Sequence, residues 1–312
     1  MDRRQATVVK HTGSHYLLSE LPEWRMIPAV LRGKIRLNGS TSTNPVAVGD
    51  VVDYEGEDIS SENPAVICGV HPRKNYIIRK STNLSRQSHI IAANLDRAFI
   101  VVTVRYPEVK LPFLDRILVT CEVYNVHPVI ILNKVDIDDE ESRFAEKLLH
   151  NIYGAAGYEI MRVSAKTGEG IDALREACDG NISLFFGPSG VGKSSLIKAL
   201  DPSLDPKVGE LSEAHVQGMH TTTFYEMYPL HSGGFIIDTP GLRSFGLVDL
   251  KKEEIGLYFP ELLKLSEECR FTPCTHTHEP HCAVLRALEE GSLSPDRYYS
   301  YLGMLEEDEK YR

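Results

Sequence analysis

The chain has 312 residues, more than a typical single domain, and its 42% of apolar residues can fill more than one hydrophobic core. No apolar run is long enough to cross a bilayer, so we expect a cytoplasmic protein without membrane contact. The formal net charge of −10 argues against a nucleic-acid partner, yet the stretch from His71 to Arg105 holds seven basic residues and a single acid, Asp96.

Short β segments, separated by Gly, Asn, Ser and Pro, fill residues 1–72. Because they lack helical periodicity, they predict a small β-barrel. An OB-type barrel fits the length and commonly holds single-stranded nucleic acid, although an SH3-like barrel fits the pattern nearly as well. The expected strands are 6–10, 26–36, 45–54 and 65–70.

Apolar runs then alternate with amphipathic segments, which is typical of a parallel sheet with crossover helices. Beyond Phe245 the pattern becomes mainly helical. The sequence thus predicts a barrel, a central α/β domain and a helical C-terminal domain. Further strands are expected at 98–104, 128–132, 159–163, 182–186, 224–228 and 235–237, and helices at 112–124, 140–153, 170–177 and 193–200.

A phosphate-binding motif of the form G-x-x-x-x-G-K-S follows the strand expected at 182–186. Its backbone N–H groups and the N-terminus of the next helix would surround the β-phosphate of a nucleotide. Lys193 is expected to act in catalysis by bridging the β- and γ-phosphates, and the Ser194 hydroxyl to bind Mg²⁺. A glycine-rich turn without a ligand is the alternative. The motif consists of Gly187, Pro188, Ser189, Gly190, Val191, Gly192, Lys193 and Ser194.

A guanine-reading tetrapeptide, Asn133-Lys134-Val135-Asp136, follows the strand expected at 128–132. The Asp136 carboxylate can accept hydrogen bonds from N1–H and the exocyclic amine of guanine, whereas adenine has no such pair of donors. Asn133 would position the loop, and the Lys134 stem would lie on the base. Alone, so short a motif could be a surface turn. The strand expected at 159–163 is followed by a second loop that can contact the base, and this second loop favours the guanine-binding interpretation. That loop is Ser164, Ala165 and Lys166.

Two later segments have the form of nucleotide-sensing switches. Asp238 would hold Mg²⁺ through a water, and the N–H of Gly241 would sense the γ-phosphate. In the segment 218–223, Thr222 is the favoured Mg²⁺ ligand, with its neighbouring threonines as alternatives.

Leu242 stands where Ras-like enzymes carry the glutamine that orients water. Leucine cannot orient water, so intrinsic hydrolysis should be slow, and a partner or another residue must supply the missing group. His220 is the best internal candidate for this catalytic role, although contact with a partner or with solvent fits it about equally well.

The base motif precedes the phosphate loop, and this reversed order indicates a circularly permuted GTPase. Such a permutation is tolerable because all of the site loops lie at one edge of the sheet. The second switch then runs directly into the C-terminal segment, so hydrolysis could reposition that segment.

A Cys/His cluster spans 14 residues near the C-terminus. Three thiolates and one imidazole can close a tetrahedral Zn²⁺ site, which would be structural because no coordination position stays open. Buried free cysteines are the alternative, and His278 or His281 could replace the histidine ligand. The candidate ligands are Cys269, Cys274, His276 and Cys282.

Together these features resemble the RsgA (YjeQ) family, the GTPases that depend on the small ribosomal subunit. The resemblance covers nearly the whole chain. It rests on R-G-K at 32–34, V-G-D at 48–50, A-A-N-L-D at 92–96, the permuted nucleotide motifs, residues 218–223 and 238–241, and the Cys/His run at 269–282.

The resemblance implies an OB barrel over residues 1–72, a permuted GTPase domain over 73–248 and a zinc domain over 249–312. It implies GTP as substrate, GDP as product, magnesium, and one zinc on Cys269, Cys274, His276 and Cys282. It also extends the phosphate-binding residues to Ser195.

The resemblance further implies binding to the small ribosomal subunit and its rRNA late in maturation, with subunit-stimulated hydrolysis favouring release. Contacts with other assembly factors are compatible with it. Because the chain is acidic overall, RNA affinity would rest on the barrel and on the basic stretch from Arg73 to Arg105. The sequence gives no sign of oligomerisation, so we expect a monomer.

Two other classes of function use some of the same motifs. A small-molecule phosphotransferase shares the phosphate loop but does not need the guanine tetrapeptide together with a switch. A nucleic-acid-binding module could keep a nucleotide only for stability, although intact Lys193, Ser194 and Asp238 argue against a vestigial site.

Overall fold

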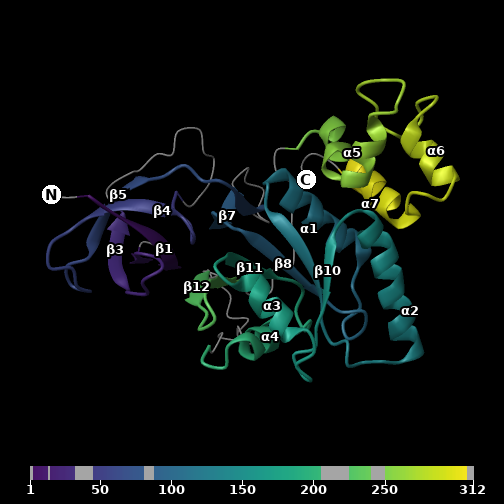
Figure 1. Ribbon diagram of the computed structural model, residues 1–312. Helices are drawn as coiled ribbons and strands as arrows, with labels where there is room; N and C mark the ends of the chain where they lie inside the picture. Colours follow the sequence, from purple (N-terminus) through teal and green to yellow (C-terminus); the bar gives the residue numbers. More distant parts are fainter. Residues whose placement is uncertain are drawn as a thin grey trace, which may run out of the picture.

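The computed structural model describes residues 3–12, 15–31, 45–80, 88–204, 225–239 and 250–307. Along the chain it contains a β-barrel, an α/β domain and a small helical unit, which lies on the α/β domain at the opposite end from the barrel (Figure 1). None of the helices in these ranges is both long and apolar enough to span a membrane.

The N-terminal barrel has the strands β1 (Arg4–Thr12), β2 (His15–Ser19), β3 (Ile27–Leu31), β4 (Val51–Glu55) and β5 (Ala65–Val70). β1 pairs with both β2 and β4, and β3 runs parallel to β5, so the order β1-β2-β3-β5-β4 closes on itself. This order is that of an OB-type barrel rather than an SH3-like one. Apolar side chains such as Val8, Leu18 and Ile67 fill its interior.

Two strands of the barrel differ from the sequence prediction. β2 lies outside the predicted strands, because its five residues are too few to show a pattern and only pairing with β1 makes them a strand. The strand predicted at 45–54 begins only at Val51. Before it, the buried Asp50 carboxylate accepts hydrogen bonds from Ala47 N at 2.9 Å and from two Arg73 nitrogens, each at 2.6 Å, and so holds a turn.

A two-stranded hairpin, β6 (Tyr76–Lys80) and β7 (Ser88–Ala93), stands between the barrel and the α/β domain (Figure 1). The sequence identifies this segment only by its basic residues and predicts no strand in it. A bridge between Val48 and Ala92 attaches the hairpin to the end of the barrel.

The α/β domain contains the strands β8 (Arg97–Val102), β9 (His127–Leu132), β10 (Glu159–Arg162), β11 (Ile182–Phe186), β12 (Glu226–Pro229) and β13 (Phe235–Asp238). They lie in the order β10-β9-β8-β11-β13-β12, all parallel except β12. β11 therefore lies between strands that precede it and strands that follow it, as a permuted chain requires. Glu226 of β12 pairs with Lys10 of β1, which makes the sheet continuous with the barrel.

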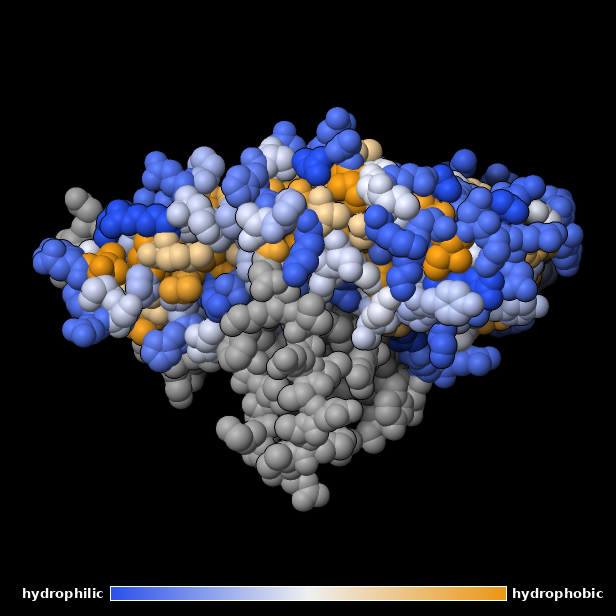
Figure 2. Space-filling model, turned by 90° about the horizontal axis from the view of Figure 1, so that it is seen from below, coloured by the Kyte–Doolittle hydropathy of each residue, from blue (hydrophilic) through white to orange (hydrophobic). Residues whose placement is uncertain are grey.

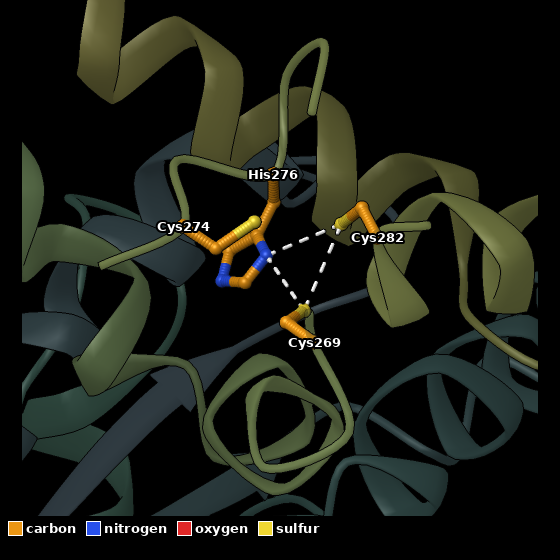
Figure 3. A group of neighbouring side chains, drawn as sticks. All are labelled: Cys269, Cys274, His276 and Cys282. Atoms are coloured by element: carbon orange, nitrogen blue, oxygen red, sulfur yellow. Dashed lines mark hydrogen bonds between the residues drawn. The ribbon is translucent and has the colours of Figure 1, made fainter. Parts of the chain in front are cut away.

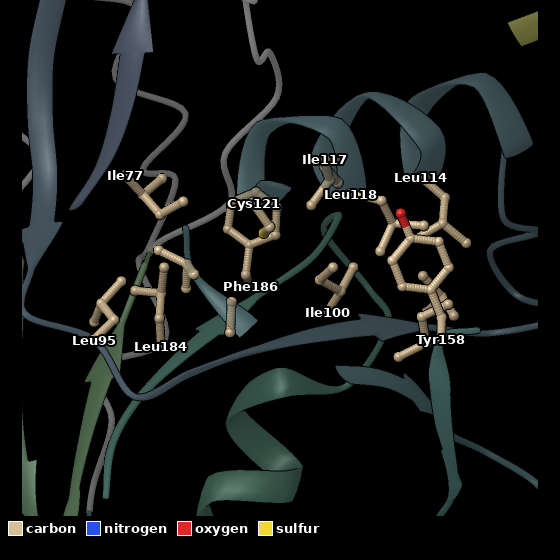
Figure 4. Close-up of a cluster of buried hydrophobic side chains, with 14 of the residues drawn as sticks. Ile77, Leu95, Ile100, Leu114, Ile117, Leu118, Cys121, Tyr158, Leu184 and Phe186 are labelled. Atoms are coloured by element: carbon tan, nitrogen blue, oxygen red, sulfur yellow. The ribbon is translucent and has the colours of Figure 1, made fainter. Parts of the chain in front are cut away.

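The helices of this domain are α1 (Leu111–Val123), α2 (Glu140–Leu149), α3 (Ile171–Cys178) and α4 (Lys193–Leu200). The helix predicted at 140–153 changes into a π-helical turn, η1 (His150–Gly154). α1 covers one face of the sheet, where Ile117 packs in the same core as Ile100 (Figure 4). α3 and α4 cover the other face, where Leu196 shares a core with Phe99. Neighbouring residues of β8 thus face two separate cores.

The C-terminal unit consists of η2 (Lys252–Tyr258), α5 (Pro260–Ser266), α6 (Ala283–Glu289) and α7 (Pro295–Glu306). It packs on the outer side of α1, where Val119 joins its apolar cluster with Phe259. Arg297 of α7 and Asp115 of α1, both fully buried, form an ion pair of 2.7 Å. The Arg297 guanidinium also donates to Glu261 of α5 at 2.6 Å. A buried charge network therefore fixes this unit to the α/β domain.

Candidate functional site

The loops that carry the nucleotide motifs follow the carboxyl ends of β9, β10 and β11, so they meet at one edge of the parallel sheet. Between them lies a cavity of about 430 Å³. Its lining comes from both predicted base loops and from the phosphate loop: Asn133, Lys134, Asp136, Ile137, Ala165, Lys166, Gly192 and Ser195.

Asn133 joins these three loops through one side-chain amide. Its Nδ2 donates to the carbonyl oxygen of Val191 at 2.8 Å, and its Oδ1 accepts from the Ala165 N–H at 3.3 Å. Gly192 has a φ of +94°, and a Cβ there would lie 2.5 Å from Asn133 Nδ2. Only glycine allows this close approach of the phosphate loop to the base loop.

The Asp136 carboxylate faces the cavity as an ionised acceptor. Ser164 Oγ donates to Asp136 Oδ1 at 2.7 Å, and Lys166 Nζ lies 3.4 Å from Oδ2. The hydrogen bond from Ser164 is the main reason why the pKa of Asp136 lies below its ordinary value, and Lys166 adds to the shift. Since two donor groups of guanine need an ionised acceptor, this state suits base recognition.

Lys134 spans the gap between the base loop and the phosphate loop. Its Nζ donates to the carbonyl oxygen of Gly190 at 2.7 Å and to that of Tyr106. Tyr106 belongs to no nucleotide motif, and the sequence offers no signal for its position beside Lys134. Its carbonyl is a contributor to the site that only the fold reveals.

The phosphate loop turns back on itself between β11 and α4. Lys193 Nζ donates to the carbonyl oxygens of Gly187 at 2.7 Å and Pro188 at 3.2 Å. Burial lowers the pKa of Lys193, and the neighbouring Asp238 opposes this shift. Burial likewise raises the pKa of Asp238, with Lys193 opposing. The two side chains therefore lie close enough for each charge to affect the other.

The end of β13 is tied to the phosphate-loop strand. Thr239 is fully buried, and its Oγ1 donates to the carbonyl oxygen of Phe185 at 2.9 Å. Asp238 therefore lies one strand away from the phosphate loop, where the motif order requires it. The predicted residues His220, Thr222, Gly241 and Leu242 lie outside the described residues.

In the C-terminal unit, the candidate ligand atoms of Cys269, Cys274, His276 and Cys282 all lie within 4.8 Å of one another (Figure 3). His276 Nδ1 is 3.4 Å from Cys282 Sγ and 3.7 Å from Cys269 Sγ, and the two sulfurs are 3.9 Å apart. A tetrahedron with Zn–S bonds of about 2.3 Å has S···S edges of about 3.8 Å. The group therefore has the size and the donor set of a structural zinc site.

The surroundings of this group fix its backbone. The hydroxyl of Tyr298 donates to the His276 carbonyl oxygen at 2.8 Å. The Glu279 carboxylate accepts from the N–H groups of Thr275 at 2.6 Å and Thr277 at 3.0 Å. Both of the other histidines considered as ligands, His278 and His281, are exposed and lie outside the four-residue group.

The comparisons with known proteins agree on one family. The sequence model of the RsgA GTPase family matches residues 70–248. A Bacteroides fragilis protein named small ribosomal subunit biogenesis GTPase RsgA is 50% identical over 307 residues, covering 98% of both chains. A protein of the same name from Flavobacterium johnsoniae is 46% identical over 305 residues, covering 98% of this chain and 94% of its own.

Solved structures show the same architecture. YjeQ from Thermotoga maritima superposes with a TM-score of 0.77 at 33% identity, covering 97% of this chain and 98% of that one. YloQ, described as a circularly permuted GTPase, gives 0.73 at 28% identity and covers 97% of this chain and 94% of its own. The predicted arrangement of an OB-type barrel, a permuted α/β domain and a helical unit with a Cys/His group is thereby confirmed.

Proposed function

The chain belongs to the RsgA GTPase family and is a GTP hydrolase, and from this premise we propose that it binds the small ribosomal subunit and its rRNA. It assists late maturation of that subunit and leaves when the subunit stimulates hydrolysis of GTP to GDP. The observation that most supports a working GTP site is the Asn133 side-chain amide. It holds the two base loops and the phosphate loop around one cavity.

Guanine is read by the Asp136 carboxylate, with Asn133 and Lys134 setting its loop. Ser164, Ala165 and Lys166 form the second wall of the base site. A base without guanine's paired donors would forfeit the hydrogen bonds to this carboxylate and so bind more weakly.

The phosphates occupy the loop from Gly187 to Ser195, and Lys193 moves from the loop carbonyls to the β- and γ-oxygens. Ser194, Thr222 and, through water, Asp238 would hold magnesium, which when bound neutralises charge on the β- and γ-phosphates. The Gly241 N–H senses the γ-phosphate. Leu242 cannot orient the attacking water, so we assign this role to His220, with a group supplied by the subunit as the alternative.

Zinc, held by Cys269, Cys274, His276 and Cys282, keeps the C-terminal unit folded. The unit has a small apolar cluster, so a metal adds stability that packing alone would supply poorly.

We place the domain boundaries at 1–72, 73–248 and 249–312.

Fewer basic side chains of the stretch 71–105 are available to bind RNA phosphates than its composition indicates. RNA contact then rests on the barrel and on the hairpin, whose strand β6 carries Arg79 and Lys80. Four basic residues of the stretch whose side chains the structure describes each lie in an ion pair with a carboxylate: Arg73, Lys74, Arg97 and Arg105.

The protein acts as a cytoplasmic monomer in this proposal, and contacts with other assembly factors are compatible with it. On the face shown in Figure 2, hydrophobic residues of the described part form small patches between hydrophilic ones. Such interrupted patches are ordinary for a monomer.

The deciding experiment measures GTP hydrolysis with and without purified small ribosomal subunits. Strong stimulation supports the proposal. Hydrolysis that the subunits leave unchanged would instead favour a nucleic-acid-binding module whose nucleotide is structural, and phosphate appearing on a metabolite would favour a phosphotransferase.

A further inference from the structure

The turn between β8 and α1 forms a compact body beside the nucleotide loops. Thr103 Oγ1 donates to the Pro107 carbonyl oxygen at 2.5 Å, and the Val109 N–H donates to the Thr103 carbonyl oxygen at 3.1 Å. At its tip, Tyr106 has a φ of +55°, which is unusual for a residue other than glycine. Such a conformation persists where its surroundings fix it.

This turn contacts both the base loop and the phosphate loop. The Tyr106 carbonyl oxygen accepts from Lys134 Nζ, so one lysine links the turn to the Gly190 carbonyl. A Cβ placed on Gly190 would lie 3.6 Å from Pro107 Cδ, which puts the proline ring against the phosphate loop. The position of the turn therefore influences where Lys134 lies.

Arg105 connects the same turn to the far end of the base loop. Its guanidinium lies 5.1 Å from the centre of the Tyr106 ring, and Nη2 donates to the Tyr106 hydroxyl at 3.2 Å. Its Nη1 contacts Asp139 at 2.7 Å and Glu141 at 3.0 Å. Asp139 in turn caps α2 by accepting from the Ser142 N–H at 2.8 Å. Asp139 stands three residues after the base-reading Asp136.

We propose that Arg105 is a positioning residue for guanine recognition: it clamps the β8–α1 turn, which holds Lys134, to the N-terminus of α2, which follows Asp136. Arg105 thus acts on the base loop through two neighbours: Tyr106, whose carbonyl oxygen accepts from Lys134, and Asp139, which stands three residues after Asp136. This inference rests on the proposed function, because it presumes that the loop reads guanine.

The size of the effect follows from exposure. The Arg105 side chain is 31% exposed and that of Asp139 47%, so water screens each ion pair and a single pair stabilises little. Two carboxylates and one aromatic ring share the guanidinium, however, so its removal breaks several contacts at once. We expect removal of Arg105 to weaken GDP binding by about threefold to tenfold.

The test compares dissociation constants for GDP and IDP, since inosine lacks the exocyclic amine that Asp136 reads. In Arg105→Ala the preference for GDP over IDP should fall by about threefold or more, and Arg105→Lys should restore part of it. The matched control is Arg143→Ala, which removes a neighbouring exposed pair with Asp138 and should leave the preference unchanged.

An unchanged GDP preference in Arg105→Ala, or an equal loss of affinity for both nucleotides, would overturn the inference. If Arg105→Ala does not fold, Asp139→Asn decides, because it weakens the same contact from the other side while the amide oxygen can still cap α2. A wild-type protein without preference for GDP would instead contradict the proposed function itself.

Discussion

Asn133 donates from its side-chain amide to the carbonyl oxygen of Val191 at 2.8 Å, and both residues are buried. They stand 58 positions apart in the sequence, one in the base loop and the other in the phosphate loop. This hydrogen bond, together with the one from Lys134 Nζ to the Gly190 carbonyl oxygen, fixes the base site relative to the phosphate site.

We predict that Asn133→Ala weakens GDP binding by about tenfold or more. The substitution leaves the Val191 carbonyl and the Ala165 N–H without their partner, which costs about 1–3 kcal/mol. Isothermal titration calorimetry measures the change. Asn63→Ala, which removes an exposed amide contact in the barrel, should bind GDP as the wild type does.

The ionisation of Asp136 predicts how GDP affinity depends on pH. Because the pKa of Asp136 is lowered, chiefly by Ser164, its charged form persists below the ordinary aspartate value of about 3.9. The contribution of this carboxylate to GDP affinity is therefore fully present above about 3.9. It is lost only as the pH falls through the lowered pKa of Asp136. GDP affinity should stay level from about pH 8 to about pH 5, measured by fluorescence with a labelled GDP. Ser164→Ala should move the acid loss to higher pH, and an identical profile in this variant would argue against the assignment.

The buried Arg297–Asp115 pair predicts a large stability effect without a direct effect on nucleotide binding. Arg297→Met leaves the Asp115 charge unpaired and should lower the stability of the folded protein by about 3–5 kcal/mol. Denaturant unfolding provides the measurement. Adding Asp115→Leu should recover much of the loss, because the second change removes the unpaired charge. A double variant no more stable than Arg297→Met would show that packing, rather than charge, explains the loss.

Removal of zinc should unfold the C-terminal unit first. Cys269→Ser is expected to bind less zinc, measured by elemental analysis, and to lower the first thermal transition in calorimetry, while GDP binding persists. The control is Cys68→Ser in the barrel, a cysteine outside the ligand group. Full zinc content in Cys269→Ser would rule out this residue as a ligand.

Charge reversal on the hairpin should affect subunit binding more than nucleotide binding. In the variant Arg79→Glu with Lys80→Glu, RNA phosphates meet negative charge, so we expect cosedimentation with small subunits to fall while GDP affinity stays unchanged. The variant Arg143→Glu with Lys147→Glu makes the same change in net charge on the exposed side of α2. Equal losses in both variants would indicate a long-range effect of charge rather than a contact.

The sequence by itself determined the chemistry of the site. A phosphate loop, a guanine tetrapeptide and a Cys/His run are local patterns, because the groups of each lie within at most 14 consecutive residues. Their reversed order likewise sufficed to predict the permuted domain, and strong apolar runs such as β9 and β11 predicted the central strands.

Only the tertiary structure decided what depends on contacts between distant segments. β2 and the β6–β7 hairpin become strands through pairing, which their own residues do not signal. Arg297 and Asp115 stand 182 positions apart, and nothing in the sequence near either residue indicates its partner. The same holds for Tyr106 and Lys134. Short stretches of sequence determine the local chemistry of a site. The free energy of strand pairing and side-chain burial depends instead on which distant segments of the chain pack against those stretches.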